Sequence, residues 1–223
     1  MNQILINHSA FLNIRPASSV RKAICIVEQV FAFQFCQAAV ALTFAVFISD
    51  FKRKAGIVPL ISEKWTRVLK LLLLVPLFVY AYALLTLNGI LTVDLFSFVL
   101  TLLGTGLVVK AKVDLARHHT WTGFCLDASK LVSRGIYSYI RHPLYAGVYL
   151  FVSGLTLTVA LHTSLYLVVP AGLALTYILS FLAVSASRET TRLEKKLGRE
   201  FTEYKKQVHF CLPLRKYAKQ KQP

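Results

Sequence analysis

Apolar residues are grouped along this chain into long blocks that contain almost no charge. Four stretches hold no Asp, Glu, Lys or Arg, at residues 29–49, 71–93, 95–109 and 143–187. An α-helix rises about 1.5 Å per residue and the hydrocarbon core of a bilayer is about 30 Å thick, so one crossing takes roughly 20 residues. The pattern is therefore typical of transmembrane helices, and the last block is long enough for two.

Two turns divide the longer blocks into single spans. Asn88 and Gly89 favour a turn between the second and third spans, and residues 161–164 interrupt the last block. The sequence thus predicts five membrane-spanning helices, at about 29–49, 69–87, 91–110, 144–161 and 165–185. Asp94, which lies near the start of the third span, is expected at the membrane interface.

Beyond the last span the pattern changes to that of an amphipathic helix. Apolar side chains recur every three or four residues, at Leu193, Leu197, Phe201, Tyr204 and Val208. Basic residues cover the other faces, which is typical of a helix lying in the membrane interface. The expected fold is an all-α polytopic membrane bundle of about five transmembrane helices plus a C-terminal amphipathic interfacial helix. Residues 1–223 would form one integral-membrane domain.

Composition and charge agree with this fold and orient it. Hydrophobic residues make up 56% of the chain and charged residues 16%, which excludes a disordered protein. Of the 26 Lys and Arg residues, 23 lie in 50–70, 110–142 and 188–223, which five spans place on one side of the membrane. Cytoplasmic loops carry the Lys and Arg excess, so we expect an external N-terminus and a cytoplasmic C-terminus. The net charge of +16 then reflects topology, and no nucleic-acid partner is expected.

The sequence contains no spacing of Cys or His residues that is typical of a metal site or a disulfide framework. The four cysteines lack a CxxC spacing, and the six histidines lack a metal-binding spacing such as HExxH. We therefore expect no bound metal and no disulfide framework.

Residues 135–147 combine several groups that suit an anion site. Pro143 is typical of a helix's first turn, so Arg141 and His142 stand at the N-terminus of the fourth span, where unsatisfied N–H groups favour negative charge. Tyrosines at 137, 139, 145 and 149 add aromatic faces with polar tips. Anchoring of Arg and Tyr at the membrane interface explains the same pattern, and both interpretations stay open.

Glu189 continues the apolar stripe of the amphipathic helix, one turn before Leu193. Such a carboxylate either pairs with Arg192 on the helix surface or faces a pocket against residues 135–147. An ionisable residue at membrane depth indicates a functional site by default. Gly104 and Gly106 in the third span indicate either close helix packing or contact with a cofactor.

These residues resemble the signature of the isoprenylcysteine carboxyl methyltransferase and phospholipid methyltransferase superfamily of integral-membrane methyltransferases. Its first half, Gly-x-Tyr-x-x-x-Arg-His-Pro-x-Tyr-x-Gly, is matched by Gly135, Tyr137, Arg141, His142, Pro143, Tyr145 and Gly147. Its second half begins with a Glu-Glu pair and ends with a Val and a Pro, and it is matched at Glu189, Leu193, Gly198, Tyr204, Val208 and Pro213. The resemblance covers roughly residues 100–213, a methyltransferase-like catalytic half with a Glu-containing helix at 186–208.

The resemblance implies an enzyme that binds S-adenosylmethionine at the cytoplasmic side, between the two halves of the signature. The expected cofactor-binding residues are Leu131, Val132, Tyr137, Arg141, His142, Pro143, Leu144, Tyr145 and Glu189. His142 and Glu189 are the candidate catalytic residues, since an amine acceptor must lose a proton. The acceptor would be apolar and enter laterally from the lipid bilayer.

Three positions depart from the family pattern. Ser129 replaces a His ahead of the Gly-x-Tyr segment, and Thr190 replaces the second acidic residue of the Glu-Glu pair. Ser185 stands where the isoprenylcysteine enzymes have an Arg that holds the substrate carboxylate. Arg188 is the nearest cation and the candidate substrate-binding residue. The third departure argues against a prenylcysteine acceptor.

The sequence therefore predicts an S-adenosylmethionine-dependent methyltransferase of the isoprenylcysteine carboxyl methyltransferase-like family, with a lipid-like or membrane-embedded acceptor. One alternative is methylation of a phospholipid amine. A transporter or channel is a further hypothesis, but its spans usually carry ionisable residues, whereas those predicted here carry almost none. A non-catalytic member of the family is the remaining hypothesis, because the second acidic residue and the Arg are missing.

Overall fold

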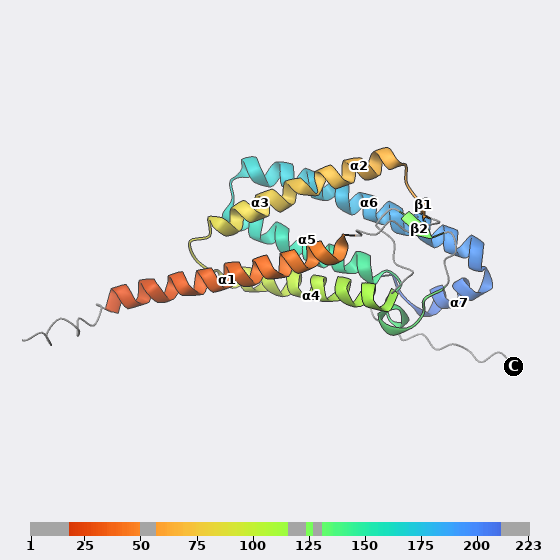
Figure 1. The fold of residues 1–223 in the computed structure, drawn as a ribbon, viewed down its shortest axis with the longest axis horizontal. Helices are drawn as coiled ribbons and strands as arrows, with labels where there is room; N and C mark the ends of the chain where they lie inside the picture. Colours follow the sequence, from red (N-terminus) through yellow and green to blue (C-terminus); the bar gives the residue numbers. More distant parts are fainter. Residues whose placement is uncertain (1–17, 50–56, 116–123, 127–130, 211–223) are drawn as a thin grey trace, which may run out of the picture.

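The fold is an elongated bundle of helices (Figure 1), in a computed structural model that describes residues 18–49, 57–115, 124–126 and 131–210. The helices are α1 (Ser18–Ile48), α2 (Glu63–Leu72), α3 (Leu74–Leu85), α4 (Thr92–Leu115), the short 3₁₀ helix η3 (Gly135–Ser138), α5 (Pro143–His162), α6 (Leu165–Leu197) and α7 (Arg199–Gln207). Two three-residue strands, β1 (Ile57–Pro59) and β2 (Phe124–Leu126), pair antiparallel. The predicted all-α bundle is confirmed, with these two short strands added.

Five helical segments of the described residues are long and apolar enough to cross a membrane. They are Val20–Ile48, Glu63–Leu85, Thr92–Leu115, Pro143–His162 and Leu165–Leu197. All five predicted spans are therefore present, and both predicted turns fall between helices. The chain is an integral membrane protein.

The first and second spans differ in detail from the prediction. α1 begins at Ser18 rather than near residue 29, because Glu28 and Gln29 are polar but do not break a helix. The second span is divided into α2 and α3 at Leu73. Pro76 lies in the first turn of α3 and has no N–H to donate to a preceding carbonyl, so the helix is interrupted there.

The predicted break between the fifth span and the amphipathic helix is wrong. α6 continues to Leu197 and ends at Gly198, whose φ is +53°, a conformation that glycine adopts at little cost. No glycine or proline lies between residues 173 and 197, so no helix-breaking residue stops the helix near residue 185. The predicted apolar stripe is shared by two helices, and Phe201, Tyr204 and Val208 pack against Leu131, Leu193 and Leu197.

α4 and α5 form the closest helix pair of the bundle. A Cβ atom added to Gly104 would lie 2.5 Å from the Phe151 nitrogen and 2.6 Å from the Gly147 oxygen. Small residues are what permit such an approach of two backbones. The packing interpretation of Gly104 is thus the correct one. A Cβ atom added to Gly106 would meet nothing within 4 Å among the described residues.

α1 is attached to the bundle through its C-terminal part. The Phe44 ring stacks on Phe151 with centroids 3.6 Å apart, and the buried Gln37 accepts a hydrogen bond from the Tyr80 hydroxyl. Lys112 of α4 donates to the Ser49 carbonyl. The ends of α1 and α4 at Ser49 and Lys112 therefore lie on the same side of the bundle.

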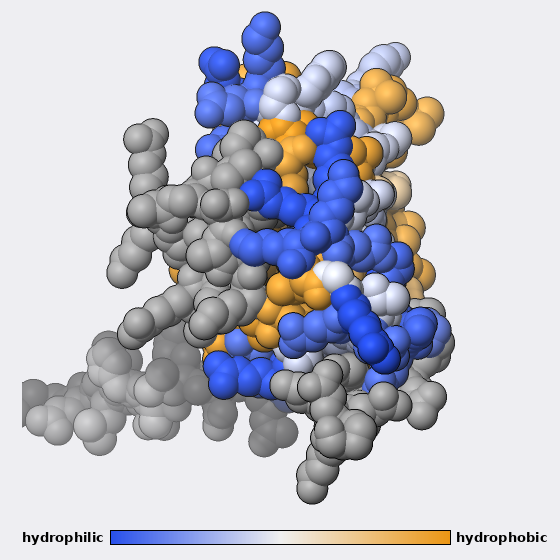
Figure 2. Space-filling model, turned by 90° about the vertical axis from the view of Figure 1, so that its right-hand side faces the viewer, coloured by the Kyte–Doolittle hydropathy of each residue, from blue (hydrophilic) through white to orange (hydrophobic). Residues whose placement is uncertain are grey.

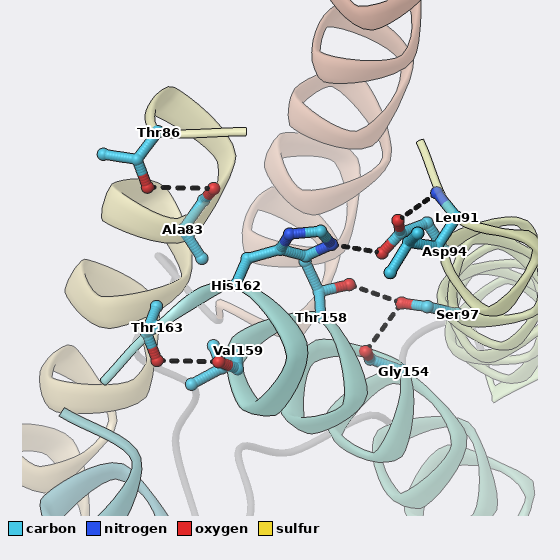
Figure 3. A network of polar contacts seen from close by, with 10 residues as sticks. All are labelled: Ala83, Thr86, Leu91, Asp94, Ser97, Gly154, Thr158, Val159, His162 and Thr163. Carbon is cyan, nitrogen blue, oxygen red and sulfur yellow. Dashed lines mark hydrogen bonds and ion pairs between the residues drawn. The ribbon is translucent and has the colours of Figure 1, made fainter. Parts of the chain in front are cut away.

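A polar network joins α4 and α5 at the end of the bundle away from α7 (Figure 3). His162 Nε2 lies 2.8 Å from Asp94 Oδ1, and Asp94 Oδ2 accepts the Leu91 N–H. Ser97 donates to the Gly154 carbonyl and contacts Thr158. Asp94 is 0% exposed, because its side chain turns inward to His162. Its expected position at the level of the membrane interface stays a prediction.

The opposite end of the bundle carries β1, β2, η3 and α7 (Figure 1). Viewed along the long axis from this end, hydrophilic side chains cover most of the described surface (Figure 2). The first half of the family signature, at residues 135–147, lies here. Charged and polar groups are thus concentrated where the predicted site residues meet.

Candidate active site

Two segments that are far apart in the sequence meet at the start of α5. Residues 140–142 run beside the chain that follows α7, with a parallel bridge between Ile140 and His209. The Arg141 N–H donates to the His209 carbonyl and the His142 N–H to the Phe210 carbonyl, at 2.9 and 3.0 Å. The proline that follows His142 disfavours a helical conformation at His142, whose φ is −124° and ψ is 61°. The C-terminal segment thus fixes the backbone of the two residues that precede α5.

η3 is held from the other side by α4 and α7. Gly135 has a φ of +61°, and a Cβ atom added there would collide with the Asp114 carboxylate. That carboxylate accepts the Ile136 N–H at 2.7 Å, and the Tyr204 hydroxyl donates to the Tyr137 carbonyl at 2.6 Å. The signature glycine is therefore required both by its conformation and by the close approach of Asp114.

His142 lies at the centre of the site as the residue that precedes α5. Its side chain is 6% exposed, with Nε2 3.2 Å from the Thr190 hydroxyl and Nδ1 3.7 Å from Glu189 Oε2. The Phe210 ring packs on the imidazole with centroids 4.8 Å apart. Burial, helped by the charge of Arg141, lowers the pKa of His142 from its usual 6.5 to about 3. The imidazole is therefore neutral at pH 7.

Glu189 faces the start of α5 from α6. The Tyr145 hydroxyl donates to its Oε2 at 3.3 Å, and this oxygen is also the one near His142. The Glu189 side chain is 34% exposed, so the carboxylate stands at the edge of the site. Of the two sequence interpretations of Glu189, the contacts observed here favour the one that faces residues 135–147.

Part of this chain is similar to a known protein family. The family model described as phospholipid methyltransferase matches residues 92–200. This part of the chain, just under half of its length, is similar to the phospholipid methyltransferase family. The family match confirms the resemblance to the superfamily of membrane methyltransferases, and no curated protein matches the chain. The extent of the catalytic half, predicted as 100–213, stays a prediction.

The other residues predicted to bind the cofactor are buried or half-buried. Tyr137 and Tyr145 are buried, and burial raises the pKa of the Tyr137 phenol. Pro143 is the first residue of α5, and Leu144 packs against the main core. The others are the half-buried Leu131, Val132 and Arg141. Their roles in cofactor binding stay predictions, and Ser129 lies outside the described residues.

Arg188 is not part of this cluster. Its Nη1 donates to the Leu60 carbonyl at 2.8 Å, in the segment that follows β1. Ser185 is fully buried, and its hydroxyl oxygen has no hydrogen-bond partner among the described residues. The structure thus brings together His142, Tyr145 and Glu189 and directs the predicted substrate-binding Arg188 elsewhere.

Sequence reasoning missed two contributors to the site. Thr190 contacts His142 directly, although the sequence marked it only as a departure from the Glu-Glu pair. The Phe210 ring packs on His142 and the Phe210 carbonyl accepts its N–H, and no local pattern indicated this residue. Among the described residues, no group of three His, Cys, Asp or Glu side chains is placed to hold a metal ion.

Proposed function

We propose that this protein transfers a methyl group from S-adenosylmethionine to the amine headgroup of a membrane lipid. The observation that carries the proposal is the convergence of His142, Tyr145 and Glu189 at the start of α5, in a chain similar to this methyltransferase family. The His142–Tyr145–Glu189 cluster draws on two helices that an amphipathic lipid could approach from the bilayer.

The groups at this site suit the cofactor. S-adenosylmethionine carries a carboxylate, a flat adenine ring and a sulfonium cation, from which it supplies the methyl group. Arg141 and the N-terminus of α5 suit the carboxylate. The rings of Tyr145 and Phe210 suit the adenine or the cation, and Glu189 suits positive charge. The tight packing of His142, 6% exposed, helps exclude water from the reacting groups.

The amine of the acceptor must lose a proton to become methylated, and Glu189 is the better candidate to receive it. His142 is a weak base at pH 7, because its pKa is lowered to about 3. Glu189 keeps one oxygen, Oε2, near Tyr145 and His142. Its other oxygen, Oε1, is the one that would take the proton from the ammonium group of the lipid.

An amine acceptor is favoured over a prenylcysteine carboxylate by the residues on α6. A buried carboxylate is costly unless a cation pairs with it. The fully buried Ser185 is neutral, and the Arg188 guanidinium donates to the Leu60 carbonyl. Neither residue supplies a cation beside Glu189, so the alternative of a phospholipid amine becomes the preferred acceptor.

The proposed orientation has the N-terminus outside and the C-terminus in the cytoplasm, where S-adenosylmethionine is available. The excess of Lys and Arg at the end of the bundle that carries α7 supports it. Single-cysteine variants near Arg134, in a background without the four native cysteines, should react with a membrane-impermeant thiol reagent only after the membrane is opened. Labelling from the outside would reverse the orientation and remove access to a cytosolic cofactor.

The activity can be tested with purified full-length protein in lipid nanodiscs. An ethanolamine phospholipid and an N-acetyl farnesylcysteine are offered together with methyl-labelled S-adenosylmethionine, and the labelled products are identified by mass spectrometry. We expect label on the phospholipid amine and none above background in Glu189→Ala. Preference for the prenylcysteine, lost in Arg188→Ala but kept in Ser185→Ala, would instead assign the acceptor carboxylate to Arg188.

A further inference from the structure

The imidazole of His142 is contacted on both nitrogens by consecutive residues of α6. Nδ1 lies 3.7 Å from Glu189 Oε2, and Nε2 lies 3.2 Å from Thr190 Oγ1. The Thr190 side chain thus points into the site rather than along its own helix. Thr191, the next residue, behaves in the ordinary way, because its hydroxyl donates to the Ser187 carbonyl one turn earlier.

The two contacts differ in which form of the ring they favour. The ionised form of a carboxylate accepts hydrogen bonds, whereas a hydroxyl can donate or accept. A proton on the nitrogen that faces Glu189 would suit this arrangement, and the other nitrogen would then accept from the Thr190 hydroxyl. The tautomer of a histidine is fixed by the partner of its second nitrogen.

We propose that Thr190 is a positioning residue, whose hydroxyl donates to His142 Nε2 and holds the neutral imidazole with its proton on Nδ1, toward Glu189. This inference rests on the proposed function. In that function, the oriented imidazole would hold the Glu189 carboxylate in place. Nδ1–H and the Tyr145 hydroxyl both point to Oε2. Oε1 is thereby left to meet the acceptor amine.

The neighbours of His142 make Thr190 the residue that decides its state. The titratable groups around the ring are Arg141 in its own segment, Tyr145 on α5 and Glu189 on α6, while the C-terminal segment contributes the Phe210 ring. A carboxylate at position 190 would face Nε2 and favour the doubly protonated ring. A neutral hydroxyl leaves Glu189 as the one carboxylate on the ring among the described residues.

The first test reads the tautomer directly. Full-length protein labelled with nitrogen-15 histidine is placed in nanodiscs, and His142→Asn assigns the His142 signals. Protonated and unprotonated ring nitrogens have well-separated chemical shifts. We expect the wild type and Thr190→Ser to carry the proton on Nδ1, and Thr190→Val to give a mixture of tautomers. Thr191→Val is the matched control and should keep the wild-type spectrum.

The second test measures methyl transfer by the same variants. Loss of one hydrogen bond between neutral groups costs about 1 kcal/mol, roughly fivefold in a rate. Thr190→Val should therefore lower kcat about fivefold with little change in KM for S-adenosylmethionine, and Thr190→Ser should restore it. In Thr190→Glu the added carboxylate favours the doubly protonated His142 ring. As the pH is lowered, kcat of this variant should therefore begin to fall at a higher pH than kcat of the wild type.

The outcomes separate the two proposals. A wild-type spectrum in Thr190→Val, or a wild-type proton on Nε2, would overturn the role of Thr190 whatever the activity. A wild-type protein that binds no S-adenosylmethionine would overturn the proposed function, while the spectra would still decide which group orients His142. The Nδ1 tautomer together with rescue by serine supports the positioning role.

Discussion

α5 has a histidine at each end, and each histidine meets a carboxylate from a neighbouring helix. His162 lies 2.8 Å from Asp94, whose side chain is 0% exposed and whose second oxygen accepts a backbone N–H. His142 lies 3.7 Å from Glu189, whose side chain is 34% exposed. An imidazole and a carboxylate thus form a closed pair at one end, His162–Asp94, and a loose pair at the other, His142–Glu189.

The difference separates a structural contact from a site that can take a ligand. At the His162 end, Ser97 and Thr158 also bond within the network, so its polar groups are satisfied by the protein itself. At the His142 end, both contacts to Glu189 fall on one oxygen. A buried polar group that is fully satisfied stabilises one arrangement, whereas the partly exposed Glu189 carboxylate can still bind a cation.

The largest effect is expected from breaking the closed pair. Asp94→Ala removes the partner of His162 and of the Leu91 N–H, and removal of one member of a buried pair costs about 3 kcal/mol of the free energy of unfolding. Thermal unfolding in nanodiscs should show a clearly lowered midpoint. The affinity of the folded protein for S-adenosylmethionine should stay within about twofold of the wild type, because the pair lies at the far end of α5. Lost affinity without lost stability would move the binding site to this end.

The loose pair should respond in the opposite way. His142→Ala and Glu189→Ala should each weaken S-adenosylmethionine binding about ten- to a hundredfold, since one charged or hydrogen-bonded contact is worth about 1.5–3 kcal/mol. Calorimetric titration measures the affinity. Glu194→Ala is the control, because Glu194 is a carboxylate of the same helix that pairs with Lys205 outside the site. Wild-type affinity in both site variants would identify these residues as structural.

A smaller effect is expected from pH. The pKa of His142 is lowered to about 3 in the folded protein, so the unfolded chain binds a proton below about pH 6.5 that the folded chain does not. The stabilisation from neutral His142 is thus present above pH 6.5 and is lost as the pH falls. Between about pH 7.5 and 5.5 the free energy of unfolding should drop by about 1.4 kcal/mol. His142→Asn cannot titrate, and its pH dependence should be shallower by that amount; an equal slope would contradict the burial of a neutral imidazole.

The sequence alone was sufficient for the spans and for the first half of the signature. Uncharged blocks indicate membrane crossings because an unpaired charge is costly in hydrocarbon, and this holds whatever the neighbouring helices are. The turn at Asn88 and the start of α5 at Pro143 follow from local chemistry in the same way. Local signals fail at the end of α6, because the change from an apolar to an amphipathic pattern near residue 185 predicts a new helix there, whereas α6 ends only at Gly198.

Tertiary structure decided which polar residues meet. His142 contacts Thr190 across 48 residues, Tyr145 contacts Glu189 across 44, and His162 contacts Asp94 across 68. A periodic pattern gives the face of a helix on which a side chain lies, but not the helix that this face meets. Asp94 and Glu189 are both carboxylates near helix ends in the sequence, and only the packing of α4, α5 and α6 makes one a buried partner of His162 and leaves the other at the edge of a site. The contact of Phe210 with His142 belongs to the same class, because it depends on where α7 turns back after Gly198.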